Sequence, residues 1–369
     1  MAALTTVTVD LPAGGYDVVV GDGAMRELPA LVAVRVPGAR HAAIVTDEHV
    51  AAQSWFGAID PGIDAAVFTV APGERVKQLA TVETLCRGFA RAGIGRADVV
   101  VSVGGGVVSD LAGFAAAVYH RGIAYCNVAT TLLAQVDAAI GGKTGVDLPE
   151  GKNLAGAFWQ PHGVLCDSAL LATLPEREWA CGRGEMAKYA FLGVPALIDL
   201  PLVDQIAACV RLKAAAVAGD ERETSGGARV LLNYGHTLAH ALEAAALDKG
   251  HPDALAHGEA VAIGLVFAAL LARRLGRIGD DRVAAHLEVV ERFGLSGALP
   301  PSLVEVDPEE LISYMARDKK AAHDLTFVLD GARGLELVHG VDPSDVDAAY
   351  ADLRALRWGP AAPGGPACT

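Results

Sequence analysis

Short apolar runs alternate with amphipathic stretches through the first half of the chain. Residues 5–20 alternate between apolar and polar positions and turn at 12–15, which predicts an N-terminal β-hairpin. Residues 76–92 repeat with the period of an amphipathic helix. The further predicted strands are residues 41–46, 65–70, 99–103 and 123–128. This strand–helix rhythm predicts a parallel sheet.

The second half is dominated by long Ala- and Leu-rich helices. They are predicted at residues 201–218, 230–246, 257–275 and 280–293, with short strand-like pieces at 325–329 and 334–338. A domain boundary near residues 174–175 follows. We expect an α/β N-terminal domain with a variant Rossmann-like parallel sheet over residues 1–175, and a mainly α-helical C-terminal domain over residues 176–358. The Pro- and Gly-rich residues 359–369 are expected to be a disordered tail.

The apolar run at residues 99–103 leads into Gly104, Gly105 and Gly106, and a small-residue helix is predicted from about Asp110. Strand, glycines and helix start together suit a bound phosphate, because backbone N–H groups can approach it and the helix N-terminus favours negative charge. Turns in which glycine serves only packing have the same pattern. The residues therefore leave a cofactor loop and a packing turn both open.

The usual dinucleotide fingerprint is incomplete in this stretch. Ser109 occupies the third glycine position, and no acidic residue ends a strand about 20 residues further on, where a ribose contact would lie. Acidic residues stand at strand ends upstream instead, at Asp47 and Glu74. A dinucleotide would have its ribose held from that side, which makes the arrangement a variant one.

Composition narrows the class of protein. A net charge of −14 argues against a nucleic-acid binder, whose affinity comes largely from neutralising phosphates. The six cysteines are scattered without a CxxC pair, which indicates free thiols in a reducing compartment. No secretory signal pattern opens the sequence, and no apolar run approaches the roughly 20 residues that span a membrane. We expect a soluble cytoplasmic protein without a membrane partner.

Histidines in the second half suggest a metal site. His236 and His240 are four residues apart and share one face of a helix, and His257 opens the next predicted helix. With Glu185 as the acidic candidate, these residues resemble a catalytic zinc site with three protein ligands and an open position. Helix-surface histidines are the alternative. Glycines beside His236 and His257 favour the metal, since they indicate close backbone approach.

Basic side chains suitable for phosphate and carboxylate groups lie in polar, glycine-rich settings. They are Arg121, Lys143, Lys152, Lys188, Lys213, Arg229, Lys319 and Lys320. For any one of them alone, a solvated surface charge is the favoured interpretation, and the case for anion binding depends on their position in GGKTG, EGKN and RDKKA.

Taken in order, these motifs resemble a known family. The runs include GGGVVSDLAGF, TTLLAQVDAAIGGKTGV, EGKN, GEMAKY, LLNYGHTLAHALE, HGEAVAIG and DKK. They are similar to 3-dehydroquinate synthase and span the chain from Asp47 to about Leu329. Together they are specific to the sugar-phosphate cyclases and less specific to one substrate.

The resemblance implies an N-terminal domain that binds NAD and a helical domain that holds a divalent metal, Zn²⁺ or Co²⁺. The implied metal ligands are Glu185, His236 and His257, whereas His240 would face the substrate phosphate. The implied NAD contacts are Asp47, His49, Glu74, Lys77, Gly104, Gly105, Gly106, Asp110, Thr130, Thr131, Lys143, Lys152, Thr173 and Glu178. An Asn is common in the family where His49 stands.

A second implied set holds the substrate. Its members are Asp137, Lys143, Asn153, Lys188, Asn233 and either Lys319 or Lys320. Lys213 and Arg229 match positions that hold the substrate carboxylate, although the ERETSGGAR segment between them is two residues longer than usual. Arg121 would reach the phosphate in a neighbouring subunit, which implies a homodimer.

The resemblance implies that 3-deoxy-D-arabino-heptulosonate 7-phosphate is converted to 3-dehydroquinate and phosphate, a step of the shikimate pathway. Transient oxidation by NAD, β-elimination of phosphate, re-reduction and an intramolecular aldol closure would follow one another. The enzyme is thus expected to be a phosphate-eliminating carbon–oxygen lyase.

Several alternatives stay open. An aminodehydroquinate synthase, or another sugar-phosphate cyclase of secondary metabolism, would keep the same anchors, and GEMAKYAF departs from the common family pattern. A cyclase whose sugar lacks a carboxylate, such as 2-deoxy-scyllo-inosose synthase, fits Arg229 less well. A metal-dependent glycerol or alcohol dehydrogenase would share the architecture but would not need the phosphate-binding motifs. Intact Glu185, His236 and His257 speak against an inactive homologue.

Overall fold

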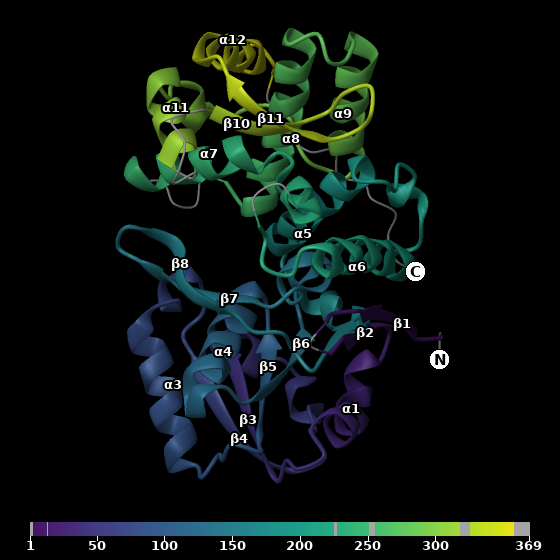
Figure 1. Ribbon diagram of the computed structural model, residues 1–369, viewed down its shortest axis with the longest axis vertical. Helices are drawn as coiled ribbons and strands as arrows, with labels where there is room; N and C mark the ends of the chain where they lie inside the picture. Colours follow the sequence, from purple (N-terminus) through teal and green to yellow (C-terminus); the bar gives the residue numbers. More distant parts are fainter. Residues whose placement is uncertain (1–2, 13, 225–226, 251–254, 318–324, 358–369) are drawn as a thin grey trace. The chain divides into compact units, whose positions relative to one another are not determined.

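The computed structural model describes residues 3–12, 14–224, 227–250, 255–317 and 325–357. The chain forms two compact units (Figure 1). Unit 1 comprises Met1–Pro175 and Pro201–Arg222, and unit 2 comprises Glu176–Leu200 and Glu223–Thr369. The predicted tail at residues 359–369 lies outside the described residues.

Unit 1 is built on a seven-stranded sheet in the order β1-β2-β9-β6-β5-β3-β4. The strands are β1 (Thr5–Val9), β2 (Tyr16–Gly21), β3 (His41–Asp47), β4 (Asp64–Val70), β5 (Val99–Gly104), β6 (Ala124–Ala129) and β9 (Gly163–Asp167). β1 and β2 form the predicted hairpin, and the other pairings in this sheet are parallel. The predicted parallel sheet is confirmed.

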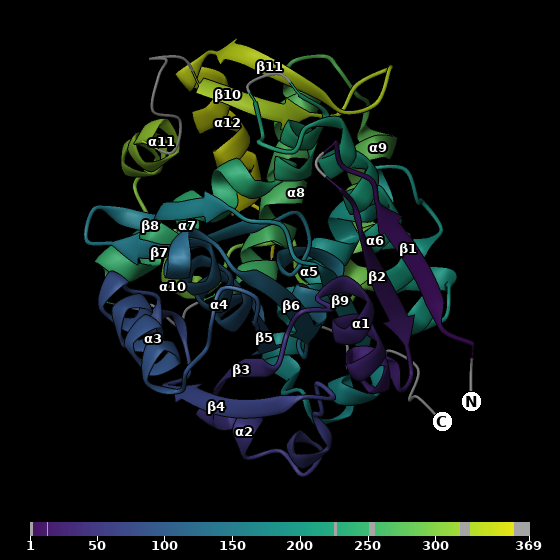
Figure 2. The same ribbon diagram turned by 60° about the horizontal axis from the view of Figure 1, so that its bottom comes forward.

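Helices cover both faces of this sheet (Figure 2). They include α1 (Leu28–Arg35), α2 (Glu48–Ala51), α3 (Leu79–Arg91), α4 (Gly106–Val118) and α6 (Leu202–Gly219). In β3, Val45 packs with α3 and α4, whereas its neighbour Ile44 packs with α1. In β5, Val100 and Val101 divide in the same way. Because both faces are buried, the strands are continuous apolar runs and do not alternate with polar residues.

A second, two-stranded sheet in unit 1 was not predicted. It pairs β7 (Lys143–Leu148) with β8 (Gly151–Phe158) as an antiparallel hairpin, preceded by a π-helix at Ala134–Ala138. A Cβ at Gly113 of α4 would lie 2.5 Å from the Thr144 side chain, so only glycine permits this approach of α4 and β7. The hairpin presents Lys143, Lys152 and Asn153.

Unit 2 is mainly helical. Its helices are α5 (Glu176–Phe191), α7 (His236–Asp248), α8 (His257–Arg274), α9 (Asp280–Arg292), α10 (Pro301–Val304), α11 (Pro308–Arg317) and α12 (Pro343–Arg354), and β10 (Leu325–Leu329) pairs with β11 (Glu336–Val341). α8 is buried along almost its whole length and packs against α5, α7, α9 and α12. It is the centre of the unit.

The prediction of a helix over residues 230–246 is wrong at the start of the helix. Ala228–Asn233 is a 3₁₀-helix, and Gly235 adopts a left-handed φ of 82° before α7 begins at His236. A left-handed residue interrupts the helical hydrogen-bond ladder, and glycine adopts that conformation without steric cost.

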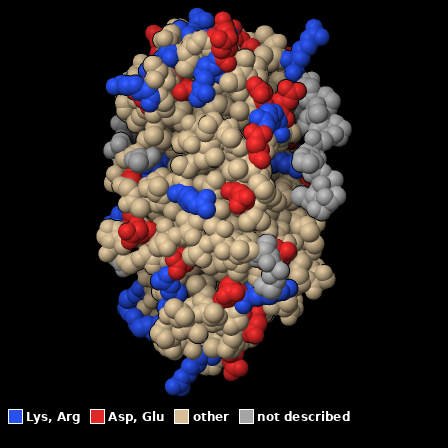
Figure 3. Space-filling model, turned by 90° about the vertical axis from the view of Figure 1, so that its right-hand side faces the viewer, with Lys and Arg blue, Asp and Glu red and all other residues tan. Residues whose placement is uncertain are grey.

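Surface charge is of mixed sign on the face in Figure 3, where Lys and Arg side chains are interspersed with Asp and Glu. Among the described helices, none combines the length and apolar character needed to cross a membrane.

Candidate active site

The sheet of unit 1 has a point at which its connections reverse direction. The chain runs from β3 outward to β4 and then returns to β5 on the other side of β3. Ligands of open parallel sheets bind beyond the carboxyl ends of the strands at such a point. Asp47 ends β3 and Gly104 ends β5. The two predicted cofactor segments therefore meet at the topological switch.

The glycine loop after β5 is tightly enclosed. A Cβ at Gly104 would lie 2.5 Å from the Val108 side chain, and one at Gly105 would lie 2.8 Å from Thr131. α4 begins at Gly106, earlier than the start expected near Asp110. The first N–H groups of this 13-residue helix have no partner within the helix. Tight glycines and free helix N–H groups together fit a dinucleotide phosphate.

A buried lysine organises the neighbouring polar residues. Lys77 is 3% exposed, and its Nζ lies 2.9 Å from Asp110 Oδ2, 2.6 Å from Asn153 Oδ1 and 3.3 Å from Glu74 Oε1. Burial lowers the pKa of Lys77, but Asp110 and Glu74 outweigh it and raise the pKa above its usual value. Burial raises the pKa of Asp110 to about 6, against the opposing effect of Lys77. The sequence analysis predicts each of these residues as a separate contact, and the fold brings their side chains together.

Another pair in unit 1 joins the π-helix to α6. Lys213 Nζ lies 2.6 Å from Asp137 Oδ1, and Lys213 is buried. Elsewhere in the unit, Trp55 Nε1 donates a hydrogen bond to Thr173 Oγ1 at 3.3 Å. Of the other predicted contacts, Thr130 is buried, whereas His49, Arg121, Lys143 and Lys152 are exposed.

In unit 2, glycines permit the helix contacts that assemble a second cluster. A Cβ at Gly184 of α5 would lie 2.1 Å from the Gly258 carbonyl oxygen of α8. A Cβ at Gly264 would lie 1.9 Å from the carbonyl oxygen of Gly235. The first contact places Glu185 beside His257, and the second places the start of α7 against α8. The expectation of close backbone approach is confirmed.

The result is a candidate metal centre. Glu185 Oε1 lies 3.1 Å from His236 Nε2 and 3.1 Å from His257 Nε2, and the three ligand atoms all lie within 4.8 Å of one another. Zinc–nitrogen and zinc–oxygen bonds are about 2.0–2.2 Å long, so atoms at these separations can share one ion. The donor set of two imidazoles and one carboxylate fits a catalytic zinc or cobalt site.

Charged neighbours and burial shift the pKa of Glu185 in opposite directions. Burial raises the pKa of Glu185, but Lys188 and His236 hold it well below its usual range. Burial lowers the pKa of His236. Lys188 is 1% exposed and forms an ion pair with Glu185, so the solvated-surface interpretation is wrong for this lysine.

The sequence analysis missed Glu243, a neighbour of the candidate metal ligands. Glu243 Oε1 lies 3.4 Å from His257 Nδ1, an arrangement in which a carboxylate orients a metal-binding imidazole. Burial lowers the pKa of His257, but hydrogen bonds to Glu185 and Glu243 outweigh it and raise the pKa to about 10. Its seven-residue spacing from His236 on one helical face could have identified Glu243.

The remaining predicted residues of unit 2 have different surroundings. The His240 ring is 5.5 Å from the ring of His236, centroid to centroid, and is exposed. Asn233 Nδ2 donates to Glu223 Oε1 at 3.2 Å, and Arg229 is 1% exposed. Glu178 is half-buried in α5. Lys319 and Lys320 lie outside the described residues.

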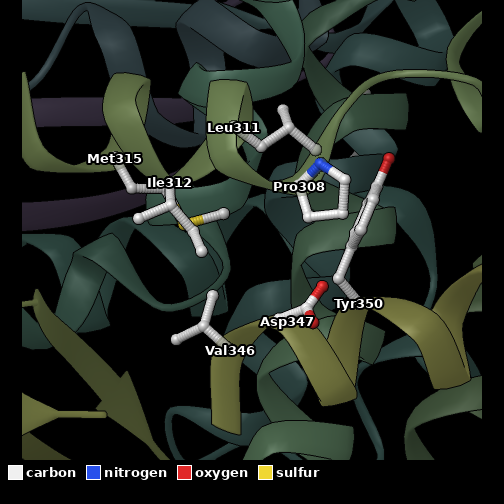
Figure 4. Close-up of a pocket in the computed structure, with 7 residues that line it drawn as sticks. All are labelled: Pro308, Leu311, Ile312, Met315, Val346, Asp347 and Tyr350. Atoms are coloured by element: carbon white, nitrogen blue, oxygen red, sulfur yellow. The ribbon is translucent and has the colours of Figure 1, made fainter. Parts of the chain in front are cut away.

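A small groove between α11 and α12 has a different character (Figure 4). Its lining is mostly apolar, with Asp347 as the charged member: Pro308, Leu311, Ile312, Met315, Val346, Asp347 and Tyr350. It contains none of the predicted site residues.

One unit has a parallel sheet suited to a dinucleotide, and the other is helical and carries a candidate metal-ligand triad. Together they indicate an enzyme that uses a dinucleotide and a divalent metal. The chain belongs to the 3-dehydroquinate synthase family. The model of the family's N-terminal part matches residues 67–181, and that of its C-terminal part matches residues 162–321.

Relatives agree with this assignment. The chain is 51% identical over 337 residues to a putative aminodehydroquinate synthase of Amycolatopsis mediterranei, covering 91% of each chain. It is 43% identical over 371 residues to the 3-dehydroquinate synthase of Nitrobacter hamburgensis, covering 92% of this chain and 94% of the relative.

A solved structure has the same fold. It is ValA, the 2-epi-5-epi-valiolone synthase of Streptomyces hygroscopicus subsp. jinggangensis, with NAD⁺ and Zn²⁺ bound. Its TM-score is 0.78 at 25% identity, covering 96% of this chain and 98% of that one.

Proposed function

We propose that this protein acts as a 3-dehydroquinate synthase, converting 3-deoxy-D-arabino-heptulosonate 7-phosphate to 3-dehydroquinate and phosphate. The observation that carries the proposal is the triad of Glu185, His236 and His257 in a chain of this family. NAD and Zn²⁺ or Co²⁺ are the proposed cofactors, as in the ValA structure. A cytoplasmic location belongs to the proposal, since the cysteine pattern favours a reducing compartment.

When bound, NAD would accept and return a hydride while the metal polarises the reacting alcohol. Glu185, His236 and His257 hold the metal, and Lys188 offsets the charge of Glu185. The switch-point loops hold the dinucleotide. The phosphate-binding role belongs to Lys143, Lys152, Asn153 and His240, and the carboxylate-binding role to Arg229 and Lys213. These roles follow the family resemblance residue by residue.

A second candidate function is aminodehydroquinate synthase, favoured by the relative at 51% identity. Phosphate release measured side by side from the heptulosonate phosphate and its amino analogue separates the two. We expect the higher kcat/KM with the hydroxyl substrate; a higher value with the amino analogue would transfer the assignment. Phosphate release from neither, with metal and NAD present, would refute the cyclase proposal.

The proposal includes a homodimer in which Arg121 serves the neighbouring site. Its support is local: His120, Arg121 and Gly122 have consecutive positive φ values of 51°, 66° and 117°. Strained backbone of this kind persists where the surroundings enforce it and is frequent at functional sites. Mixing inactive Arg121→Ala and His236→Ala proteins should restore part of the activity, and a mixture as inactive as its components would count against shared sites.

A further inference from the structure

We propose that Tyr234 and His286 position the metal ligand His236 through a buried hydrogen-bond relay. The inference rests on the proposed metal site and adds two residues to it that lie outside the ligand set. Both act through other groups, so they are positioning residues.

The first link joins the ligand to the backbone. His236 Nδ1 lies 3.2 Å from the Tyr234 carbonyl oxygen. A carbonyl oxygen only accepts, so the proton of the neutral imidazole resides on Nδ1. Its Nε2 lone pair is therefore available on the side of Glu185, where the metal would bind. Outer partners of this kind fix both the tautomer and the ring orientation of metal-binding histidines.

The second link joins Tyr234 to α9. The Tyr234 hydroxyl lies 2.6 Å from His286 Nε2, and His286 Nδ1 lies 2.7 Å from the Arg282 carbonyl oxygen. By the same reasoning, His286 Nδ1 carries a proton and donates to Arg282. Nε2 of the neutral ring must then accept from the tyrosine hydroxyl. Each hydrogen bond of the relay thus has one possible direction.

Packing restrains the relay. Tyr234 and His286 are both 0% exposed, and the Phe191 ring stacks on His286 at a centroid distance of 3.9 Å with 3° between the planes. Burial lowers the pKa of His286 to about 4, so its ring stays neutral at physiological pH. Phe191 belongs to α5, the helix that carries Glu185. The same core therefore supports two of the three ligands.

The backbone needs such an anchor. Tyr234 is followed by Gly235 at φ 82°, a residue with few conformational restrictions. Rotation of the peptide between them would turn the Tyr234 carbonyl away from His236. The hydrogen bond to His286 holds the tyrosine ring and thereby restrains the Tyr234 Cα, from which the carbonyl extends toward His236.

Cobalt binding tests the relay. The full-length apoprotein is titrated with Co²⁺ against a competing chelator, with the visible spectrum of the bound ion as a second readout. His286→Leu and Tyr234→Phe break the relay, and His286→Gln retains an acceptor for Tyr234 and a donor for Arg282. Phe267→Leu is the matched control, since Phe267 is buried in α8 and packs near Phe327.

We expect the dissociation constant for Co²⁺ to rise roughly tenfold in His286→Leu and Tyr234→Phe, the lower end of outer-partner effects. The cobalt spectrum should shift in both, whereas Phe267→Leu and His286→Gln stay close to the wild type. Affinities of the relay variants equal to that of Phe267→Leu would overturn the inference, as would an unchanged spectrum in whichever of them folds. A wild-type protein that binds no Co²⁺ would overturn the metal site and the relay together.

Discussion

Each unit holds a cluster built around one buried charged side chain, Lys77 in unit 1 and Glu185 in unit 2, and the partners of the two differ. In unit 1, the ammonium group of Lys77 contacts Asp110, Asn153 and Glu74. Its three partners are oxygen atoms, so one lysine completes the cluster. In unit 2, one oxygen of Glu185 faces two imidazole nitrogens at 3.1 Å each. Lys188 pairs with the other oxygen, Oε2, so Glu185 Oε1 and the two imidazole nitrogens form a separate set of lone-pair donors that can share an added cation.

The difference shows how buried charge separates structure from chemistry. The Lys77 cluster joins three segments of unit 1 by direct contacts and so contributes to the fold. In unit 2, burial lowers the pKa of His257, but its hydrogen bonds to Glu185 and Glu243 raise the pKa to about 10. Protonation and metal binding compete for such ligands.

The largest expected effect is on catalysis. His236→Ala removes a proposed metal ligand, and loss of several kcal/mol of metal-derived stabilisation corresponds to roughly a 10³-fold fall in kcat/KM. Phosphate release is the measurement. His339→Ala, which changes an exposed histidine of the same unit, is the matched control. A His236→Ala protein with near-normal turnover would remove the contrast between the clusters.

Substitution of Lys77 in unit 1 should lower the free energy of unfolding. Lys77→Met leaves Asp110 and Glu74 without their cation; because solvent reaches both carboxylates, the expected cost is about 1–3 kcal/mol of unfolding free energy, below that of a fully buried ion pair. Urea unfolding followed by circular dichroism measures the change. Arg87→Met, which breaks an exposed pair with Glu83, should cost less than about 1 kcal/mol. Equal losses in the two variants would show that the Lys77 cluster is not structural.

Metal binding should stabilise the native protein by mass action. At a free Zn²⁺ concentration of about 100 times the dissociation constant, the gain is about 2.7 kcal/mol. A chelator should remove it, and the Lys77→Met protein should keep the same metal-dependent increment as the wild type. Thermal unfolding with and without metal measures this increment. The His236→Ala protein should show no metal-dependent increase in stability.

The last expected effect is a pH dependence from Asp110. Its folded-state pKa of about 6 lies above the ordinary 3.8, so its stabilising contribution is fully present below about pH 4 and is lost as pH rises through 6. The slope is at most about 1.4 kcal/mol per pH unit. Asp110→Asn should abolish it. Unfolding free energies from about pH 4 to 7 test this; parallel curves for both proteins would contradict the shifted pKa.

Most of unit 1's sheet could be predicted because its strands are buried on both faces and form unbroken apolar runs. The β7–β8 hairpin could not, since Gly145, Gly151 and Gly156 interrupt it and its stability depends on contact with α4. The break before α7 was missed because the Ala- and Leu-rich pattern continues across Gly235.

The sequence by itself determined the chemical identity of the sites: a glycine loop after a buried strand, two histidines on one helical face and a third at the next helix start. Only the tertiary structure decided which groups meet. Asn153 joins Lys77 across 76 residues, and His257 joins Glu185 across 72. Local periodicity places side chains on a face of one element, whereas the partner of that face depends on close packing between elements. Here that packing depends on glycines such as Gly184 and Gly258, which allow α5 and α8 to touch.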